Sequence, residues 1–166
     1  MSADGDRSAG EYDWFETTLR VRYAETDKMG VVYHSNFIVW FEVGRTDLCR
    51  QCGFLYRDME LEDDAHLMVV DVRCRYRRPA RYDDDILVRT RVADFARRTL
   101  RFEYEIVRAS TGELLAEGET KHVVTSAEGR PRAFPARQAG LVLARLKAMA
   151  AAGTLDVEQL DGTIKE

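Results

Sequence analysis

Residues 23–37 read YAETDKMGVVYHSNF and lead directly into an apolar segment, FIVWFEV, at residues 37–43. Asp27 stands just before Gly30 and shortly before the predicted start of a helix near Ser35. The first turn of a helix leaves N–H groups unpaired and carries partial positive charge. Such donors can stabilise a developing oxyanion while a neighbouring carboxylate acts on the adjacent carbon. Asp27 beside a helix start is therefore the first candidate site of the chain.

A long helix is predicted from about Ser35 to about Cys52. Ser35 or Asn36 suits its N-terminal cap, and Gly53 suits its end. The first half is apolar on nearly every side, which predicts a buried helix. Gly44 lies inside it, where glycine costs about 1 kcal/mol relative to alanine. A glycine at that position predicts the close approach of another backbone.

Alternating apolar and polar residues predict five strands around this helix. The predicted strands cover Thr17 to Tyr23, Val70 to Tyr76, Ile86 to Val92, Leu100 to Ile106 and about Leu114 to Thr125. The segment from Phe54 to Ala65 predicts a turn with a short helix or loop, and Ala136 to Ala152 predicts a second helix. Short connections favour antiparallel neighbours. The predicted fold class is α+β, with a curved antiparallel sheet covering the long helix.

The bulk composition fits one compact domain, because 166 residues at 45% hydrophobic can bury a sizeable core. We expect a single domain over residues 14–152, flanked by tails at residues 1–13 and 153–166. The net charge of -4 argues against a nucleic-acid partner. Basic clusters at residues 73–81 and at Arg97 and Arg98 suit an anionic small ligand, although a solvated strand edge is the better explanation of any single arginine.

Cysteine usage and hydropathy indicate the compartment. The chain has 3 cysteines, an odd number, and no segment with the pattern of a signal peptide. These features predict a cytoplasmic protein. Cys49 and Cys52 form a C-x-x-C pair without further ligands, so we expect two packed thiols rather than a zinc site. No run of about 18 apolar residues predicts a membrane span.

A set of motifs resembles a known family. The matching residues are Tyr23, Asp27, Gly30 to His34, Asn36, Phe37, Phe41, Glu42 and Arg45, followed by PARYDDDILV at residues 79–88. Together they resemble the hotdog fold, and more closely the 4-hydroxybenzoyl-CoA thioesterase family. That family includes short acyl-CoA thioesterases associated with the bacterial Tol-Pal system. The resemblance extends from about Thr17 to Thr125.

The resemblance implies a reaction and a catalytic site. It implies hydrolysis of acyl-CoA thioesters without metal or organic cofactor. Asp27 matches the catalytic aspartate, acting as nucleophile or as general base. His34 matches the helix-start position whose backbone N–H polarises the thioester carbonyl. Tyr23 matches a polar partner of the aspartate.

The resemblance also implies a substrate site and an assembly. Arg97 and Arg98, with Thr99 beside them, match the residues that bind the CoA nucleotide, and Tyr33 and Trp40 are expected to contact the substrate. Hotdog sites lie between two subunits, which implies a homodimer or homotetramer. The acyl chain and the choice between CoA and acyl carrier protein stay open.

Several alternatives accompany this interpretation. Glu42 is a rival catalytic acid on the helix, although an ion pair with Arg45 three residues later is the simpler expectation. Tyr23 suits a core tyrosine as well as a site residue, and His122 suits a packed core residue. Competing functions are a hydratase or dehydratase on the same fold, and a non-catalytic module that binds acyl-CoA or acyl carrier protein.

Overall fold

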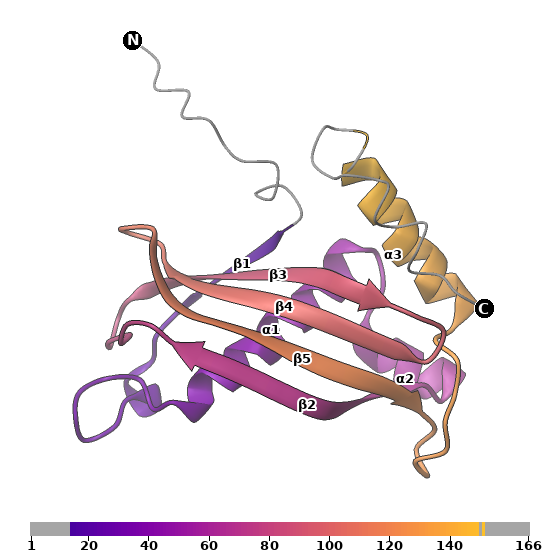
Figure 1. Ribbon diagram of the computed structural model, residues 1–166, viewed down its shortest axis with the longest axis horizontal. Helices are drawn as coiled ribbons and strands as arrows, with labels where there is room; N and C mark the ends of the chain where they lie inside the picture. Colours follow the sequence, from indigo (N-terminus) through magenta and orange to yellow (C-terminus); the bar gives the residue numbers. More distant parts are fainter. Residues whose placement is uncertain (1–13, 150, 152–166) are drawn as a thin grey trace.

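An antiparallel sheet of five strands forms the body of the computed structural model, which describes residues 14–149 and 151 (Figure 1). The predicted tails lie outside the described residues. The strand order is β1-β3-β4-β5-β2, so β1 and β2 form the two edges. The strands are β1 (Phe15–Arg20), β2 (His66–Tyr76), β3 (Asp85–Phe95), β4 (Thr99–Arg108) and β5 (Glu113–Thr125). The predicted fold class is confirmed.

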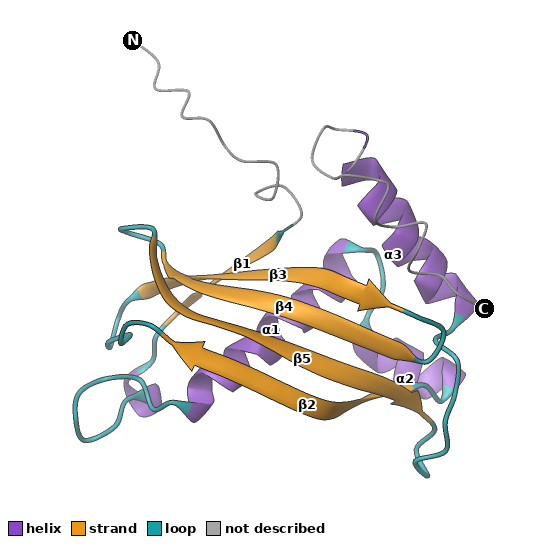
Figure 2. Ribbon diagram, in the orientation of Figure 1, coloured by secondary structure: helices purple, strands orange, loops and turns teal. Residues whose placement is uncertain are grey.

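Helix α1 (Ser35–Gln51) runs along one face of this sheet (Figure 2). Its bounds agree with the predicted helix to within one residue, and Gly53 follows its end with a φ of 100°. A short helix, α2 (Tyr56–Asp63), occupies the segment predicted as turn and helix. Helix α3 (Ala136–Met149) follows the sheet and confirms the second predicted helix over the described residues.

Two glycines let α1 lie close against the sheet. A Cβ atom on Gly44 would meet Thr90 Oγ1 and would lie 2.7 Å from Val88 Cγ1, both on β3. A Cβ atom on Gly118 of β5 would lie 2.6 Å from the ring of Phe41. The predicted close approach at Gly44 is therefore confirmed, although the atoms it meets are side chains of β3 rather than another backbone.

The prediction that α1 is buried on all sides is wrong. Ile38, Val39 and Val43 are 37%, 47% and 38% exposed. The physical reason is that the sheet covers one side of the helix, while the opposite side has no neighbour within the described residues. The predicted apolar face of β2 is also exposed, with Val70 at 54% and Val72 at 37%, because β2 lies at an edge of the sheet.

A chain of polar side chains crosses the core between β4 and β5. The hydroxyls of Tyr104 and Thr120 lie 2.7 Å apart, and Thr120 Oγ1 lies 2.8 Å from Nε2 of His122. His122 is fully buried, as predicted. Burial, together with the nearby charge of Arg45, lowers the pKa of His122 to about 4. The ring is therefore neutral in the folded protein at neutral pH.

Replacing Gly44 by alanine should destabilise the protein, although alanine is normally the better helix former. The added methyl group would overlap Val88 and Thr90, and we expect a loss of about 1–3 kcal/mol in the free energy of unfolding. Gly140→Ala on α3 is the matched control, since its Cβ would meet nothing within 4 Å. That variant should gain up to about 1 kcal/mol in urea unfolding. Equal gains in both variants would contradict the close approach.

Acidification should weaken the fold through His122. The unfolded chain binds a proton near pH 6.5, whereas the folded chain binds it only near pH 4. Stability should therefore fall as the pH drops through this window, by at most about 3 kcal/mol. His122→Gln should flatten the dependence of the unfolding free energy on pH, and His66→Gln, which leaves the buried ring in place, should retain it. Identical slopes in wild type and His122→Gln would refute the assignment.

Candidate active site

The loop that carries Asp27 is a tight, internally bonded turn. Oδ1 of Asp27 accepts a hydrogen bond from the N–H of Met29 at 2.8 Å, and the N–H of Gly30 donates to the Asp27 carbonyl at 2.9 Å. The N–H of Asp27 donates to the carbonyl of Val31 at 2.8 Å. Gly30 adopts a φ of 74°, which glycine tolerates without steric cost. The second carboxylate oxygen, Oδ2, has no hydrogen-bond donor within the described residues.

The start of α1 lies next to this loop. Within residues 14–149, the N–H groups of His34 and Ser35 donate to no acceptor, as is usual in a first helical turn. The carbonyl of His34 accepts a hydrogen bond from the Tyr76 hydroxyl at 2.9 Å, which ties the helix start to the end of β2. Free donors therefore stand close in sequence to a carboxylate with one free oxygen, the combination that the sequence predicted for Asp27 and His34.

The predicted helix cap by Ser35 or Asn36 is wrong. His34 occupies the cap position, and no side chain caps the helix. The side chain of Asn36 instead turns back and donates from Nδ2 to the carbonyl of Glu25 at 2.9 Å. Because this bond competes with capping, the N–H groups of His34 and Ser35 stay available, while that of Asn36 donates to the carbonyl of Tyr33.

Glu25 is a buried acid that the sequence prediction missed. It is 6% exposed, and its carboxylate accepts hydrogen bonds from the backbone N–H of Arg22 at 2.7 Å and from Nε1 of Trp40 at 3.1 Å. Burial acts to raise the pKa of Glu25, but the bonds from Arg22 and Trp40 outweigh it and leave the pKa below its usual range. The sequence feature that could have pointed to Glu25 is its position, two residues before Asp27 in the same loop segment.

A cavity of about 350 Å³ opens beside Asp27 and His34. Its wall is largely apolar, and the end of β2 supplies an aromatic ring and two cations. The lining residues besides Asp27 and His34 are Met29, Val31, Val32, Phe37, Tyr76, Arg77, Arg78 and Pro79. Tyr76, Arg77 and Arg78 were not predicted as site residues, since only the fold brings the end of β2 to the start of α1. The cavity places Asp27 and the start of α1 around one space large enough for a thioester.

Tyr23 does not lie on the apolar face of a strand, and it is not a core residue. Strand β1 ends at Arg20, and Tyr23 begins a short 3-10 helix, η1 (Tyr23–Glu25), because the Glu25 carboxylate binds the N–H of Arg22 and turns the chain. The ring of Tyr23 is 77% exposed and meets Tyr82 edge to face at 5.7 Å. It lies outside the wall of the Asp27 cavity.

The predicted substrate contacts of Tyr33 and Trp40 are not found on the cavity wall. Trp40 is 1% exposed, because it packs in the core with its indole N–H bound to Glu25. Tyr33 is exposed and packs beside the ring of His34, with centroids 4.4 Å apart. Trp40 thus holds the buried carboxylate of Glu25, and Tyr33 is not among the residues that line the cavity.

The turn between β3 and β4, which contains Arg97 and Arg98 and leads into Thr99, lies at the opposite end of the sheet from the loop before α1 that contains Asp27 (Figure 1). The Asp27 loop adjoins the segment that leads into β3, because the N–H of Val32 donates to the carbonyl of Ala80 at 2.8 Å. Arg97 follows the far end of that strand, which has 11 residues. A strand of this length spans on the order of 35 Å. One chain therefore does not bring the predicted nucleotide residues to the predicted catalytic residue.

The expected ion pair between Glu42 and Arg45 is not formed. Within the described residues Glu42 is exposed without an ion-pair partner, and Arg45 is half-buried beside Tyr104 and His122. Glu42 lies on the side of α1 that faces away from the sheet, and it does not line the Asp27 cavity. Its position therefore does not support the rival catalytic role in this chain.

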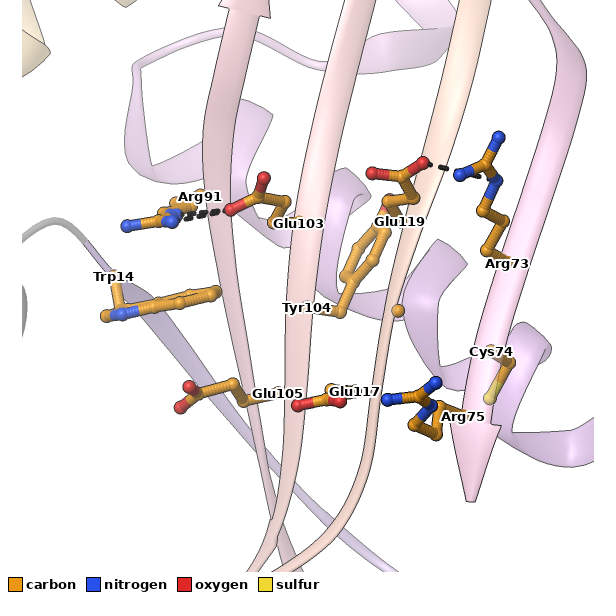
Figure 3. Close-up of a pocket in the computed structure, with 11 residues that line it drawn as sticks. Trp14, Arg73, Cys74, Arg75, Arg91, Glu103, Tyr104, Glu105, Glu117 and Glu119 are labelled. Carbon is orange, nitrogen blue, oxygen red and sulfur yellow. Dashed lines mark hydrogen bonds and ion pairs between the residues drawn. The ribbon is translucent and has the colours of Figure 1, made fainter. Parts of the chain in front are cut away.

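A larger hollow, of about 530 Å³, lies on the face of the sheet away from α1 (Figure 3). Its floor carries Glu103 opposite Glu119, and Glu105 opposite Glu117, on adjacent strands. Arg101 bridges the first pair, at 2.8 Å and 3.2 Å. The other ion pairs of this face are Arg91–Glu103, Arg73–Glu119, Arg89–Glu105 and Arg77–Glu117. These acids are neutralised by their neighbours, so the hollow is a solvated ion-pair surface.

Metal-binding and membrane-spanning features are absent from the described part of the chain. Residues 14–149 contain no group of three or more potential metal ligands. Cys49 and Cys52 are buried free thiols, as predicted, and burial raises the pKa of Cys49 to about 12. Over the same residues, none of the helices has the length and apolar character to cross a membrane.

Comparison with known proteins identifies similar chains. The sequence profile of the thioesterase-like superfamily matches residues 21–151. A Bacillus subtilis protein named putative acyl-CoA thioesterase YneP is 39% identical over 122 residues, covering 70% of this chain and 87% of its own length. The Escherichia coli acyl-CoA thioester hydrolase YbgC is 34% identical over 122 residues, covering 73% and 90%.

Solved structures support the same similarity. The crystal structure of a DHNA-CoA thioesterase from Staphylococcus aureus superposes with a TM-score of 0.76 at 31% identity, covering 86% of this chain and 97% of that one. The overall fold is therefore shared with a thioesterase of known structure.

Proposed function

Because this chain belongs to the thioesterase-like superfamily, we propose that it is an acyl-CoA thioesterase that converts an acyl-CoA and water to a carboxylic acid and free CoA. The observation that carries the proposal is the pairing of Asp27 with the start of α1 around one cavity. The relatives named as acyl-CoA thioesterases support CoA as the leaving group, and no organic cofactor is part of the proposal.

The chemistry follows from the two halves of the site. The carbonyl oxygen of the thioester would accept hydrogen bonds from the N–H groups of His34 and Ser35, where the negative charge of the tetrahedral intermediate develops. Asp27 then either attacks the carbonyl carbon or removes a proton from an attacking water. Collapse breaks the C–S bond and releases the CoA thiolate, which takes up a proton. In the first route a mixed anhydride forms and water hydrolyses it.

The rival functions are less well supported. A hydratase or dehydratase acts beside the carbonyl and would need an acid on the helix, but Glu42 lies outside the cavity. A module that only binds acyl-CoA or acyl carrier protein would not need a carboxylate with a free oxygen next to unpaired N–H groups. The free, buried thiols of Cys49 and Cys52 fit the proposed location in the reducing cytoplasm.

The proposed active unit is a homodimer in which the partner completes the substrate site. Strand β2 bonds to β5 on one side only, and its exposed edge carries Met68, Val69 and Val70. Antiparallel pairing of two β2 edges across a two-fold axis would join the sheets and reverse the partner's direction. The partner's Arg97 and Arg98 would then approach this chain's Asp27, which supports their role in binding the CoA phosphates.

Asp27→Asn should abolish nearly all thioesterase turnover and leave the fold intact, because the amide can neither attack nor remove a proton. Free CoA release from short, long and aromatic acyl-CoAs measures the loss, and thermal unfolding checks the fold. Glu42→Gln is the matched control and should retain turnover. Full activity in Asp27→Asn would contradict the assignment of Asp27 as nucleophile or general base.

Mixed dimers test the shared site. Arg97→Glu with Arg98→Glu should raise KM for acyl-CoA with little change in kcat, since the phosphates are bound alike in ground and transition states. At acyl-CoA concentrations well below the raised KM, mixing these chains with Asp27→Asn chains should restore about half of the wild-type kcat/KM per mixed dimer, because one of its two sites then contains both intact groups. If each site used residues of one chain, mixing would restore nothing.

A further inference from the structure

Glu25 is a buried acid whose bonds all lead to the segments around Asp27. An acid is rarely buried unless it is paired, because desolvating a carboxylate is costly. Glu25 is 6% exposed and lies two residues before Asp27. It does not line the cavity beside Asp27, so direct contact with substrate does not explain its burial. Its hydrogen bonds give another explanation.

The side chain of Glu25 joins the end of β1 to the second turn of α1. One carboxylate oxygen, Oε2, accepts the backbone N–H of Arg22 at 2.7 Å. The other, Oε1, accepts the indole N–H of Trp40 at 3.1 Å and lies 3.4 Å from the Arg22 guanidinium. Trp40 is itself fixed in the core, so the carboxylate is attached to a rigid part of the helix.

The backbone of Glu25 closes the same loop. Its carbonyl accepts the N–H of Tyr33 at 2.9 Å and the side-chain N–H of Asn36 at 2.9 Å. The residue thus holds both ends of the loop over residues 26–34 and connects them to α1. The hydrogen bonds of Asp27 itself stay inside the loop, so they do not set its position relative to the helix.

We propose that Glu25 is a positioning residue, which holds the Asp27 carboxylate and the first N–H groups of α1 in one fixed geometry. The proposal rests on the thioesterase function proposed above. A displacement of about 1 Å between reacting groups lowers rates by on the order of 100-fold. Glu25 acts through Trp40 and the loop, without touching the thioester.

The ionised state of Glu25 strengthens both bonds. Burial acts to raise its pKa, but the bonds from Arg22 and Trp40 outweigh that effect and hold the pKa below its usual range. A carboxylate accepts stronger hydrogen bonds than a neutral amide. A glutamine at this position would keep an acceptor for Trp40 but would turn an N–H group towards the N–H of Arg22. Glu25→Gln should therefore lower kcat less than Glu25→Ala does.

The kinetic test separates positioning from general stability. Glu25→Ala should lower kcat by on the order of 100-fold with KM changed by less than about threefold, because substrate binding groups stay in place. Trp40→Phe should lower kcat in the same direction, and the double variant should be no worse than Glu25→Ala alone. Val88→Ala, a core change on β3, should lower the Tm comparably and leave kcat unchanged. A kcat for Glu25→Ala equal to that of Val88→Ala would overturn the proposal.

A second measurement needs no substrate. Amide hydrogen exchange of the Val32 and Tyr33 N–H groups should speed up by about tenfold or more in Glu25→Ala relative to wild type, while the amides of β4 keep their rates. Unchanged exchange in the loop would overturn the proposal. If the wild-type protein hydrolyses no acyl-CoA, the proposed function fails, and the exchange rates still decide whether Glu25 fixes the loop.

Discussion

The close contact of α1 with the sheet is the constraint on which the rest of the structure depends. Gly44 and Gly118 remove the side chains that would hold the two layers apart, and Phe41 then stacks on Tyr104 with ring centroids 4.3 Å apart. Because α1 lies close against the sheet, Trp40 is buried, and its indole N–H bonds to Glu25 at the start of the loop that precedes α1. The loop is thereby tied to the helix, and the helix to the sheet, in one continuous packing arrangement.

The same contact supports the proposal that one chain builds only part of the substrate site. Five strands cover one side of α1, so Ile38 and Val39 on the other side remain exposed, as does the edge of β2. The proposed catalytic half, around Asp27, lies at one end of the sheet, and the basic turn at Arg97 lies at the other. Under the proposed two-fold pairing, the exposed edge of β2 contacts its copy in the partner. This contact brings the Asp27 end of one sheet next to the Arg97 end of the other.

Local patterns were enough to predict the elements, and tertiary contacts explain the failures. Periodicity predicted α1 and the five strands, and an unfavourable helical glycine predicted the close approach at Gly44. Tyr23 was placed on a strand because its alternation continued past Arg20, but the carboxylate of Glu25 turns the chain there. Trp40 was predicted to contact the substrate. No feature of the sequence indicates that its indole N–H donates to the same carboxylate. The turn after Arg20 and the buried position of Trp40 both depend on one buried acid, whose partners are 3 residues before it and 15 after it.

Glu25 and Asp27 show why burial alone does not identify a catalytic carboxylate. Both oxygens of Glu25 are engaged by donors, so a reaction at that group would first have to break the bonds that hold the loop. Asp27 has one oxygen bonded to the N–H of Met29 and one without a donor in the described chain, and it faces a cavity. A reacting carboxylate needs a fixed position and a free lone pair together. Under the two proposals, Glu25 provides the fixed position, and Asp27 provides the free lone pair.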